Sequence, residues 1–243
     1  MNDATGPVLT DELLEDCLQA VHRIAAQGRA ARLHEVAEFA RVAHAEAEAA
    51  LSELRSRGLV GTDYPAVIVL TDEGQKQAAC VLRRHRLSER LLTDVLGLPW
   101  DRVHEEAMRL EHALDAKAES RLESLLRHPE TCPHGAPIPV PDGTHAPPAS
   151  RTLDQVPAGI CVRIAQVIEE DGALLRYLAS LGLLPQARLS VEEVAPFGGP
   201  LLVRVGEARY ALGRDVARKI LVNEDRDDRT APLRARRRWR GKR

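Results

Sequence analysis

Apolar residues recur at helical spacing in the first quarter of the chain. Between residues 10 and 28 the stripe consists of Leu13, Leu14, Cys17, Leu18, Val21, Ile24 and Ala25. This spacing predicts a helix that Thr10 caps and Gly28 ends. A shorter helix over 32–40 and a longer one over 44–57 follow. The β-prone runs LVGTDY and AVIVLT, split by Tyr64-Pro65, then predict a hairpin. Three helices and a hairpin in this order predict a winged helix-turn-helix over residues 8–72.

The next part of the chain keeps a helical pattern. Thr71 opens a long helix that we expect to run to Leu96, where Gly97 ends it. Helices over 100–114 and 116–127 complete a helical domain at 73–140. Residues 128–157 are rich in Pro, Gly, Thr and Ala, and we expect order near Cys132-Pro133-His134 and a linker over 141–157.

The pattern changes to short β-type runs after the linker. The runs CVRIAQVI, RLSVEEV, LLVRVG and ARYAL, with one helical turn near 174–181, predict a small β-domain at 158–223. Residues 224–243 lack apolar content, which is typical of a disordered tail. The predicted fold class is therefore mainly α with a C-terminal β-domain.

Composition narrows the class of protein. Aromatic residues make up only 3% of the 243 residues, so the core must consist of Ala, Leu and Val, which favours helices. The net charge of −2 gives the whole molecule no general attraction for nucleic acid. However, residues 229–243 contain eight Arg or Lys and no acid. This basic tail is either a solvated end or a source of phosphate contacts.

The cysteines and the apolar runs predict a cytoplasmic protein. Four scattered cysteines without a CxxC pair fit a reducing compartment better than a disulfide framework. The polar, acidic N-terminus does not resemble a signal peptide. No apolar run approaches the roughly 20 residues that span a bilayer.

Side chains that can bind metals gather on two predicted helices. His85 and Glu89 are four residues apart, so they share one face of the long helix. On the next helix, four such residues fall within an arc of about 100°: His104, Met108, Glu111 and His112. These residues are either surface charge pairs with a core methionine or ligands of one or two transition-metal ions. Cys132 and His134 alone cannot close a tetrahedral zinc site, so we interpret them as part of a structural turn.

Four motifs give this region a family resemblance. They are H-R-L-x-E-R-x-L from His85, V-H-E-E-A from Val103, x-E-H at 110–112 and C-P-H-G-x-P-I-P from Cys132. Together they resemble the metal-binding and dimerisation segment of the diphtheria toxin repressor-like family. The string ALLRYLASLGLLP resembles that family's SH3-like, FeoA-type module. The resemblance extends over about residues 10–223 and implies a homodimeric, metal-dependent repressor that binds double-stranded operator DNA.

The resemblance also implies ligands for two ions per subunit. It assigns an ancillary ion to His85, Glu89, His104 and an acid of the C-terminal module, for which we choose Glu170. It assigns a primary, activating ion to Asp16, Met108, Glu111 and His112, with Asp16 identified by L-E-D-C-L. His85 could instead join the primary site in a two-metal arrangement. Met108 departs from the cysteine of iron sensors and the glutamate of manganese sensors. A thioether favours Fe(II) and the hard Asp16 oxygen favours Mn(II). We expect Mn(II), with Fe(II) as the close alternative.

The expected recognition helix departs furthest from the family pattern. The family segment usually begins S-x-P-[ST]-V-[ST], whereas this chain has small and acidic residues at the positions near base edges: Ala43, Ala45, Glu46, Glu48 and Ala49. Acids favour a helix N-terminus but repel phosphates, although Glu can accept from the cytosine amino group. The expected DNA contacts are Arg41, His44, Arg55 and Arg57.

Three classes of function follow from these observations. The first is a metal-activated repressor that controls metal homeostasis genes. The second is a metal sensor with impaired DNA reading that acts through a partner or the basic tail. The third is a metalloenzyme, which the sequence disfavours because it has no HExxH motif, nucleophile elbow or phosphate loop. We therefore predict no enzymatic activity and no small-molecule substrate.

Overall fold

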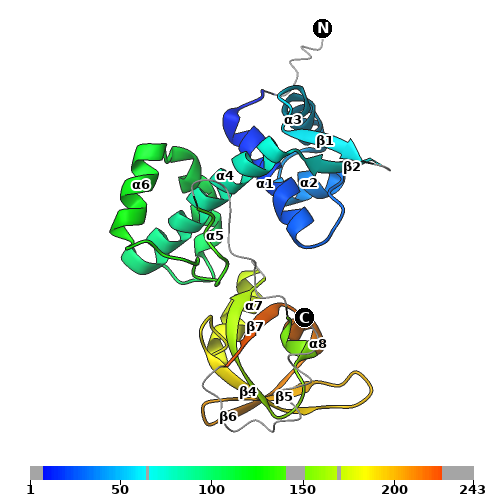
Figure 1. Cartoon of the computed structure of the whole chain (residues 1–243), viewed down its shortest axis with the longest axis vertical. Coiled ribbons are helices and arrows are strands. Elements are labelled where there is room, and N and C mark those ends of the chain that lie inside the picture. Colours follow the sequence, from blue (N-terminus) through cyan, green and yellow to red (C-terminus); the bar gives the residue numbers. More distant parts are fainter. Residues whose placement is uncertain (1–7, 64–65, 141–150, 169–170, 226–243) are drawn as a thin grey trace. The chain divides into compact units, whose positions relative to one another are not determined.

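The computed structural model describes residues 8–63, 66–140, 151–168 and 171–225. The chain folds as two compact units. The first comprises Met1–Arg86, Arg109–Glu119 and Pro139–His145, and the second comprises Leu87–Met108, Ser120–Ile138 and Ala146–Arg243. Figure 1 shows the helices of the first unit and the curled sheet of the second.

The first unit begins with the winged helix-turn-helix expected from the sequence. Its helices are α1 (Asp11–Ala26), α2 (Leu33–Ala40) and α3 (His44–Ser56). The strands β1 (Val60–Asp63) and β2 (Val67–Leu70) form an antiparallel wing, with Val60 opposite Leu70. Thr10 caps α1 because its Oγ1 accepts from the backbone N–H of Leu13 at 3.2 Å. The predicted apolar stripe of α1 is buried in the core of this unit from Leu13 to Ile24, whereas Ala25 is exposed.

The long helix differs from its prediction at its C-terminal end. Thr71 caps α4 (Asp72–Arg90) by accepting from the backbone N–H of Gly74 at 3.0 Å. The helix then widens into a π-helical turn over Leu91–Val95 instead of continuing as an α-helix to Leu96. The helix expected over 100–114 is α5 (Val103–Leu110) followed by a 3-10 turn, Glu111–Ala113, and α6 spans Ala116–Leu125.

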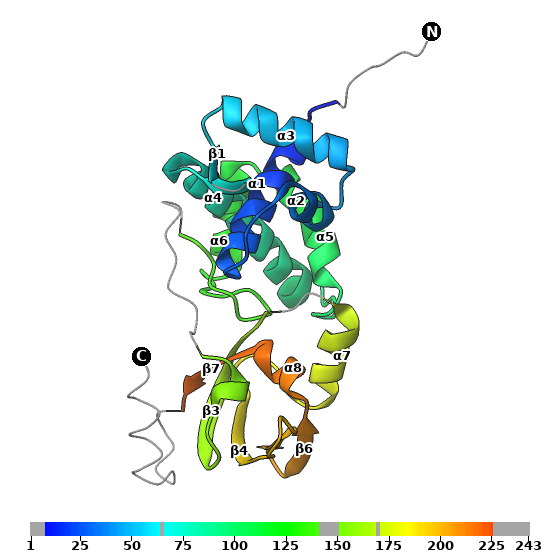
Figure 2. The ribbon, with the colours of Figure 1, turned by 90° about the vertical axis from the view of Figure 1, so that its right-hand side faces the viewer.

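The β-domain of the second unit is one antiparallel sheet of five strands in the order β6-β5-β4-β3-β7. The strands are β3 (Ile160–Val167), β4 (Arg188–Val194), β5 (Leu201–Val205), β6 (Ala208–Leu212) and β7 (Ile220–Glu224). The helices α7 (Gly172–Ser180) and α8 (Arg214–Arg218) lie at the same end of the curled sheet (Figure 2). The sequence pattern indicated neither β7 nor α8. Residues 151–157, expected in the linker, pack onto the sheet through buried Leu153 and Val156.

Several predictions concern residues outside the described ranges. These are Glu170, most of the expected linker and the basic tail from residue 226 onward. Within the described part of the chain, no helix is both long enough and apolar enough to span a membrane.

Candidate metal centres

The first cluster of metal-capable side chains lies in the first unit, where α1 packs beside the 3-10 turn Glu111–Ala113. Asp16 Oδ1 lies 3.1 Å from Nε2 of His112. Ligand atoms of Asp16, Glu111 and His112 all lie within 4.8 Å of one another. The structure thus brings together three of the four residues that the sequence assigned to the primary ion. The fourth, Met108, is half-buried and lies one turn before them on α5.

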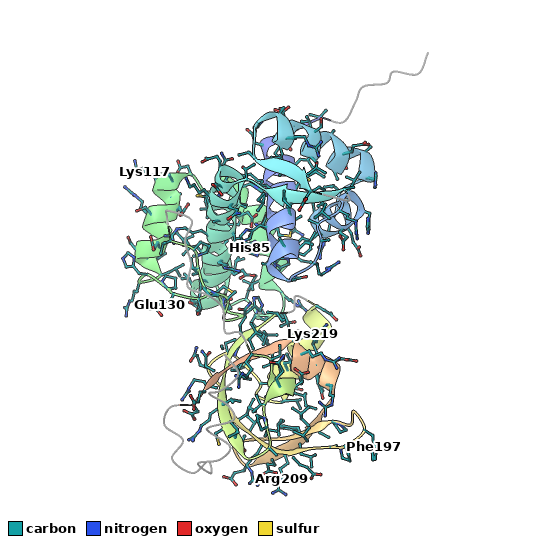
Figure 3. All side chains as sticks on the ribbon, turned by 45° about the vertical axis from the view of Figure 1, so that its right-hand side comes forward. His85, Lys117, Glu130, Phe197, Arg209 and Lys219 are labelled. Carbon is teal, nitrogen blue, oxygen red and sulfur yellow. The ribbon has the colours of Figure 1, made fainter. Side chains whose placement is uncertain are left out.

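The carboxylate of Glu111 is completely buried in this cluster. Its Oε1 accepts from the side-chain amide of Gln19 at 3.1 Å, and its Oε2 contacts Nδ1 of His85. His85 projects from α4, is 2% exposed and belongs to the same unit (Figure 3). This contact is the one that the alternative with His85 in the primary site requires, and the assignment of His85 to the ancillary site stays a prediction.

The imidazole of His112 lies between two acids of α1. Its Nδ1 faces Glu15 Oε2 at 2.9 Å, while its Nε2 faces Asp16. The hydrogen bonds with Asp16 and Glu15 outweigh the effect of burial and raise the pKa of His112 to about 10. At neutral pH the metal-free cluster therefore holds a positive charge among carboxylates, which is a place where a divalent cation can substitute for a proton.

The second cluster lies in the second unit and consists of Glu89, Cys132 and His134, all buried. Nδ1 of His134 is 3.5 Å from Glu89 Oε1 and 4.0 Å from Cys132 Sγ. The same oxygen of Glu89 is 3.7 Å from Nδ1 of His104. Glu89 therefore lies beside two histidines, of which the sequence singled out only His104 as a ligand.

The turn that carries Cys132 and His134 is the structural element expected from its motif. The backbone N–H of Cys132 donates to the Ala136 carbonyl at 2.9 Å, and the N–H of Gly135 donates to the Cys132 carbonyl at 2.9 Å. Arg90 fastens the turn to α4 by donating from Nε to the Thr131 carbonyl at 2.6 Å. The sequence could not show that Glu89 faces this turn, because 43 residues separate Glu89 from Cys132.

The orientation of the His134 ring suits a metal ligand. Its Nε2–H donates to the Trp100 carbonyl at 2.8 Å, and the ring stacks on the indole with centroids 5.4 Å apart. Because the carbonyl fixes Nε2, the other ring nitrogen, Nδ1, faces the metal-capable side chains of Glu89 and Cys132. Burial opposes protonation, but the hydrogen bonds with Cys132 and Glu89 raise the pKa of His134 to about 10.

The predicted DNA contacts are exposed and lie on α3 or next to its ends. Arg55 donates to Thr62 Oγ1 at 2.8 Å, and Arg57 pairs with Glu53 at 2.8 Å. His44 and Arg41 are exposed, and Arg41 adopts a left-handed conformation with φ 55°. Glu46 caps α3 by accepting from the backbone N–H of Ala43 at 2.8 Å. Glu46 is thus used for helix capping, as an acid in a first turn commonly is.

Two family models match the chain. Residues 71–140 match the metal-binding and dimerisation domain of iron-dependent repressors, and residues 151–224 match the FeoA domain. The iron-dependent repressor IdeR of Mycobacterium leprae is 34% identical over 186 residues, which cover 72% of this chain and 80% of that protein. This chain belongs to the diphtheria toxin repressor family. The diphtheria toxin repressor of Corynebacterium diphtheriae is 36% identical over 126 residues, or 49% of this chain and 56% of that protein.

Solved structures of this repressor family share the fold over most of the chain. A manganese-dependent transcriptional repressor in complex with manganese is 33% identical, with a TM-score of 0.79, and the match covers 87% of this chain and 99% of that one. IdeR of T. acidophilum is 28% identical, with a TM-score of 0.74, over 90% of this chain and 100% of that one. These matches confirm the predicted fold class.

Proposed function

We propose that this protein is a cytoplasmic, metal-dependent transcriptional repressor that binds operator DNA as a homodimer when loaded with Mn(II) or Fe(II), and so controls genes of metal homeostasis. The observation that carries this proposal is the contact between Asp16 of α1 and His112 of the 3-10 turn. It joins a helix of the winged helix-turn-helix to the matched metal-binding and dimerisation domain. The relatives are named repressors, which favours direct DNA binding over action through a partner alone.

The first ion would be held by the cluster of the first unit. Asp16, Glu111 and His112 supply two carboxylates and an imidazole, and His85 and Met108 are available from α4 and α5. Oxygen and imidazole donors suit Mn(II) and Fe(II), and the Met108 thioether shifts the preference toward Fe(II). Loaded there, the ion would supply the positive charge that the proton on His112 supplies in its absence.

The second ion would be held around Glu89. The sequence assigned it to Glu89, His104 and His85 with help from Glu170. A set formed by Glu89, Cys132 and His134 is supported by their burial and by ligand atoms that all lie within 4.8 Å of one another. A thiolate with an imidazole and a carboxylate fits a transition metal better than a hard ion such as Mg²⁺.

Cobalt can test the second ligand set, because a thiolate bound to Co(II) gives an intense near-ultraviolet charge-transfer band. We expect this band in the wild type and its loss in Cys132→Ser, with a fall of roughly tenfold or more in affinity for one of the two ions. Cys161→Ser, a change at a half-buried cysteine of β3, is the matched control and should keep the band. A wild type without the band, together with the loss of one ion in His104→Ala, would favour the set with His104, which contains no thiolate.

Apolar side chains on the second unit support assembly into a dimer. Val95, Leu96 and Leu125 are 53%, 59% and 63% exposed, although they lie in or beside helices of the domain that the family model names for dimerisation. A two-fold dimer would present two copies of α3 to successive half-sites of an operator, about one helical turn apart. Arg41, His44, Arg55 and Arg57 are the proposed contacts.

The whole proposal predicts that DNA binding depends on metal. Duplexes selected from a random pool in the presence of Mn(II) should bind the full chain with Mn(II) or Fe(II) and lose most of that binding with a chelator. Light scattering of the complex should give two chains, or a multiple of two, per duplex. Equal affinity with metal and with chelator would refute a metal-dependent repressor, and one chain per duplex would refute the dimer.

A further inference from the structure

Glu15 lies beside the first metal cluster and has both of its carboxylate oxygens engaged. Oε2 accepts from Nδ1 of His112 at 2.9 Å, and Oε1 accepts from the Arg84 guanidinium at 2.6 Å. All three residues belong to the first unit. Neither Glu15 nor Arg84 stood out in the sequence, where an acid on α1 and an arginine on α4 are typical of solvated helix faces.

The ring of His112 can offer only one nitrogen to an ion. Its Nε2 faces Asp16 at 3.1 Å and Glu111 Oε1 at 3.9 Å, so this nitrogen points into the ligand cluster. Its Nδ1 points away from the cluster to Glu15. A carboxylate that accepts the Nδ1–H of a ligating histidine fixes the tautomer and the ring orientation, and makes Nε2 a better donor.

Arg84 holds Glu15 in the position that this arrangement needs. The two side chains are 16% and 33% exposed, and the guanidinium approaches the oxygen that His112 does not use. A carboxylate held from both sides loses little further rotamer freedom when the ion binds. Arg84 immediately precedes His85, so the same turn of α4 supports the cluster from two directions.

We propose that Glu15, held by Arg84, is a positioning residue that directs Nε2 of His112 toward the first ion. The inference rests on the proposed role of Asp16, Glu111 and His112 as ligands of that ion. It assigns Glu15 no bond to the metal, because both of its oxygens already accept hydrogen bonds. The ion's affinity then depends on a residue of α4 that does not touch it.

The test compares isosteric and matched variants of the full chain by calorimetric titration with Mn(II). Glu15→Gln keeps the shape and removes the charge, and we expect a fall of about 10- to 100-fold in affinity for the first ion. Arg84→Ala should lower the affinity in the same direction, and Arg84→Lys should restore part of it. Glu12→Gln changes an exposed acid of the same helix and should leave the affinity unchanged.

A spectroscopic measurement separates positioning from general damage. With Zn(II) as a diamagnetic probe, ¹⁵N NMR of the wild type should show His112 protonated at Nδ1 and ligated through Nε2. In Glu15→Gln a fraction of the molecules should be ligated through Nδ1 instead, so the spectrum should show both tautomers. Thermal unfolding of the metal-free Glu15→Gln protein is compared with that of metal-free Glu12→Gln to detect a general loss of stability. If Glu15→Gln does not fold, the comparison of Arg84→Ala with Arg84→Lys decides in its place.

The outcomes distinguish this inference from the proposal beneath it. If Asp16→Ala and His112→Ala bind both ions as the wild type does, the ligand assignment itself is wrong. If those variants lose an ion while Glu15→Gln and Arg84→Ala keep wild-type affinity and a single Nδ1–H tautomer, the positioning role alone is refuted.

Discussion

Asp16→Ala is expected to abolish most of the metal stimulation of DNA binding while leaving the fold and the dimer intact. Asp16 lies on α1 of the winged helix-turn-helix, whereas Glu111 and His112 lie in the matched metal-binding and dimerisation domain. An ion bound by both parts favours the placement of α1 in which all of its ligands meet. Differential binding of this kind is what couples a metal site to a DNA site.

The size of the effect follows from typical allosteric coupling. A coupling free energy of about 1–3 kcal/mol corresponds to about 5- to 150-fold in DNA affinity. In Asp16→Ala the ratio of DNA affinities with and without Mn(II) should fall to near one. Electrophoretic shifts with a selected duplex measure this ratio, and light scattering verifies the dimer.

Two further variants show whether the effect belongs to Asp16. Glu12→Ala removes an exposed acid from the same helix and should respond to Mn(II) as the wild type does. His104→Ala changes a residue beside Glu89 and should have a milder effect than Asp16→Ala. If Asp16→Ala responded to Mn(II) and Fe(II) like the wild type, the ion could not act through α1, and activation would have to arise within the dimerisation helices.

The elements that sequence alone predicted well are those set by local periodicity. The stripe from Leu13 to Ile24 and the cap at Thr10 define α1 within about two residues. The strands β4 and β6 match the expected runs because a run of β-prone residues is a local signal. In contrast, β7 is a short strand of three apolar residues followed by two polar ones. It forms a strand because it pairs with β3, some 55 residues earlier in the chain.

The candidate ligands could be predicted from local spacing, but the contacts between distant parts of the chain could not. Spacing on one helix was enough to single out His85 with Glu89, and Met108 with Glu111 and His112. Periodicity could not show that Gln19 donates to Glu111, since 92 residues separate them. Nor could it show that His85 contacts Glu111 or that Glu89 faces Cys132. These pairings arise from tertiary packing, which only the folded chain supplies.

Gly135→Ala is expected to separate the turn of Cys132 and His134 from the sheet of the second unit. Gly135 has φ +86°, and a Cβ there would overlap the Ala165 carbonyl oxygen and lie 2.9 Å from the Cα of Gln166. These obstacles are backbone atoms of β3, so no side chain can rotate away to make room. The hydrogen bond from the Val167 N–H to the His134 carbonyl, at 2.9 Å, should break with the displacement.

Gly159→Ala is a matched control for this substitution. Gly159 has a similar φ of +81°, but a Cβ there would meet no atom within 4 Å. Both variants bear the cost of a left-handed alanine, about 1–2 kcal/mol, and only Gly135→Ala adds the overlap with β3. Chemical denaturation should therefore show a larger loss of unfolding free energy for Gly135→Ala than for Gly159→Ala.

The same pair of variants tests whether the turn must be docked on β3 to hold the second ion. Displacing the turn moves Cys132 and His134 away from Glu89, so Gly135→Ala should lose the thiolate–Co(II) band that Gly159→Ala keeps. The first ion, whose proposed ligands Asp16, Glu111 and His112 lie in the first unit, should bind both variants as it binds the wild type. Equal losses of stability in the two variants would mean that the turn yields without leaving the sheet. If Gly135→Ala also kept the thiolate–Co(II) band, binding of the second ion would not require the turn to be docked on β3.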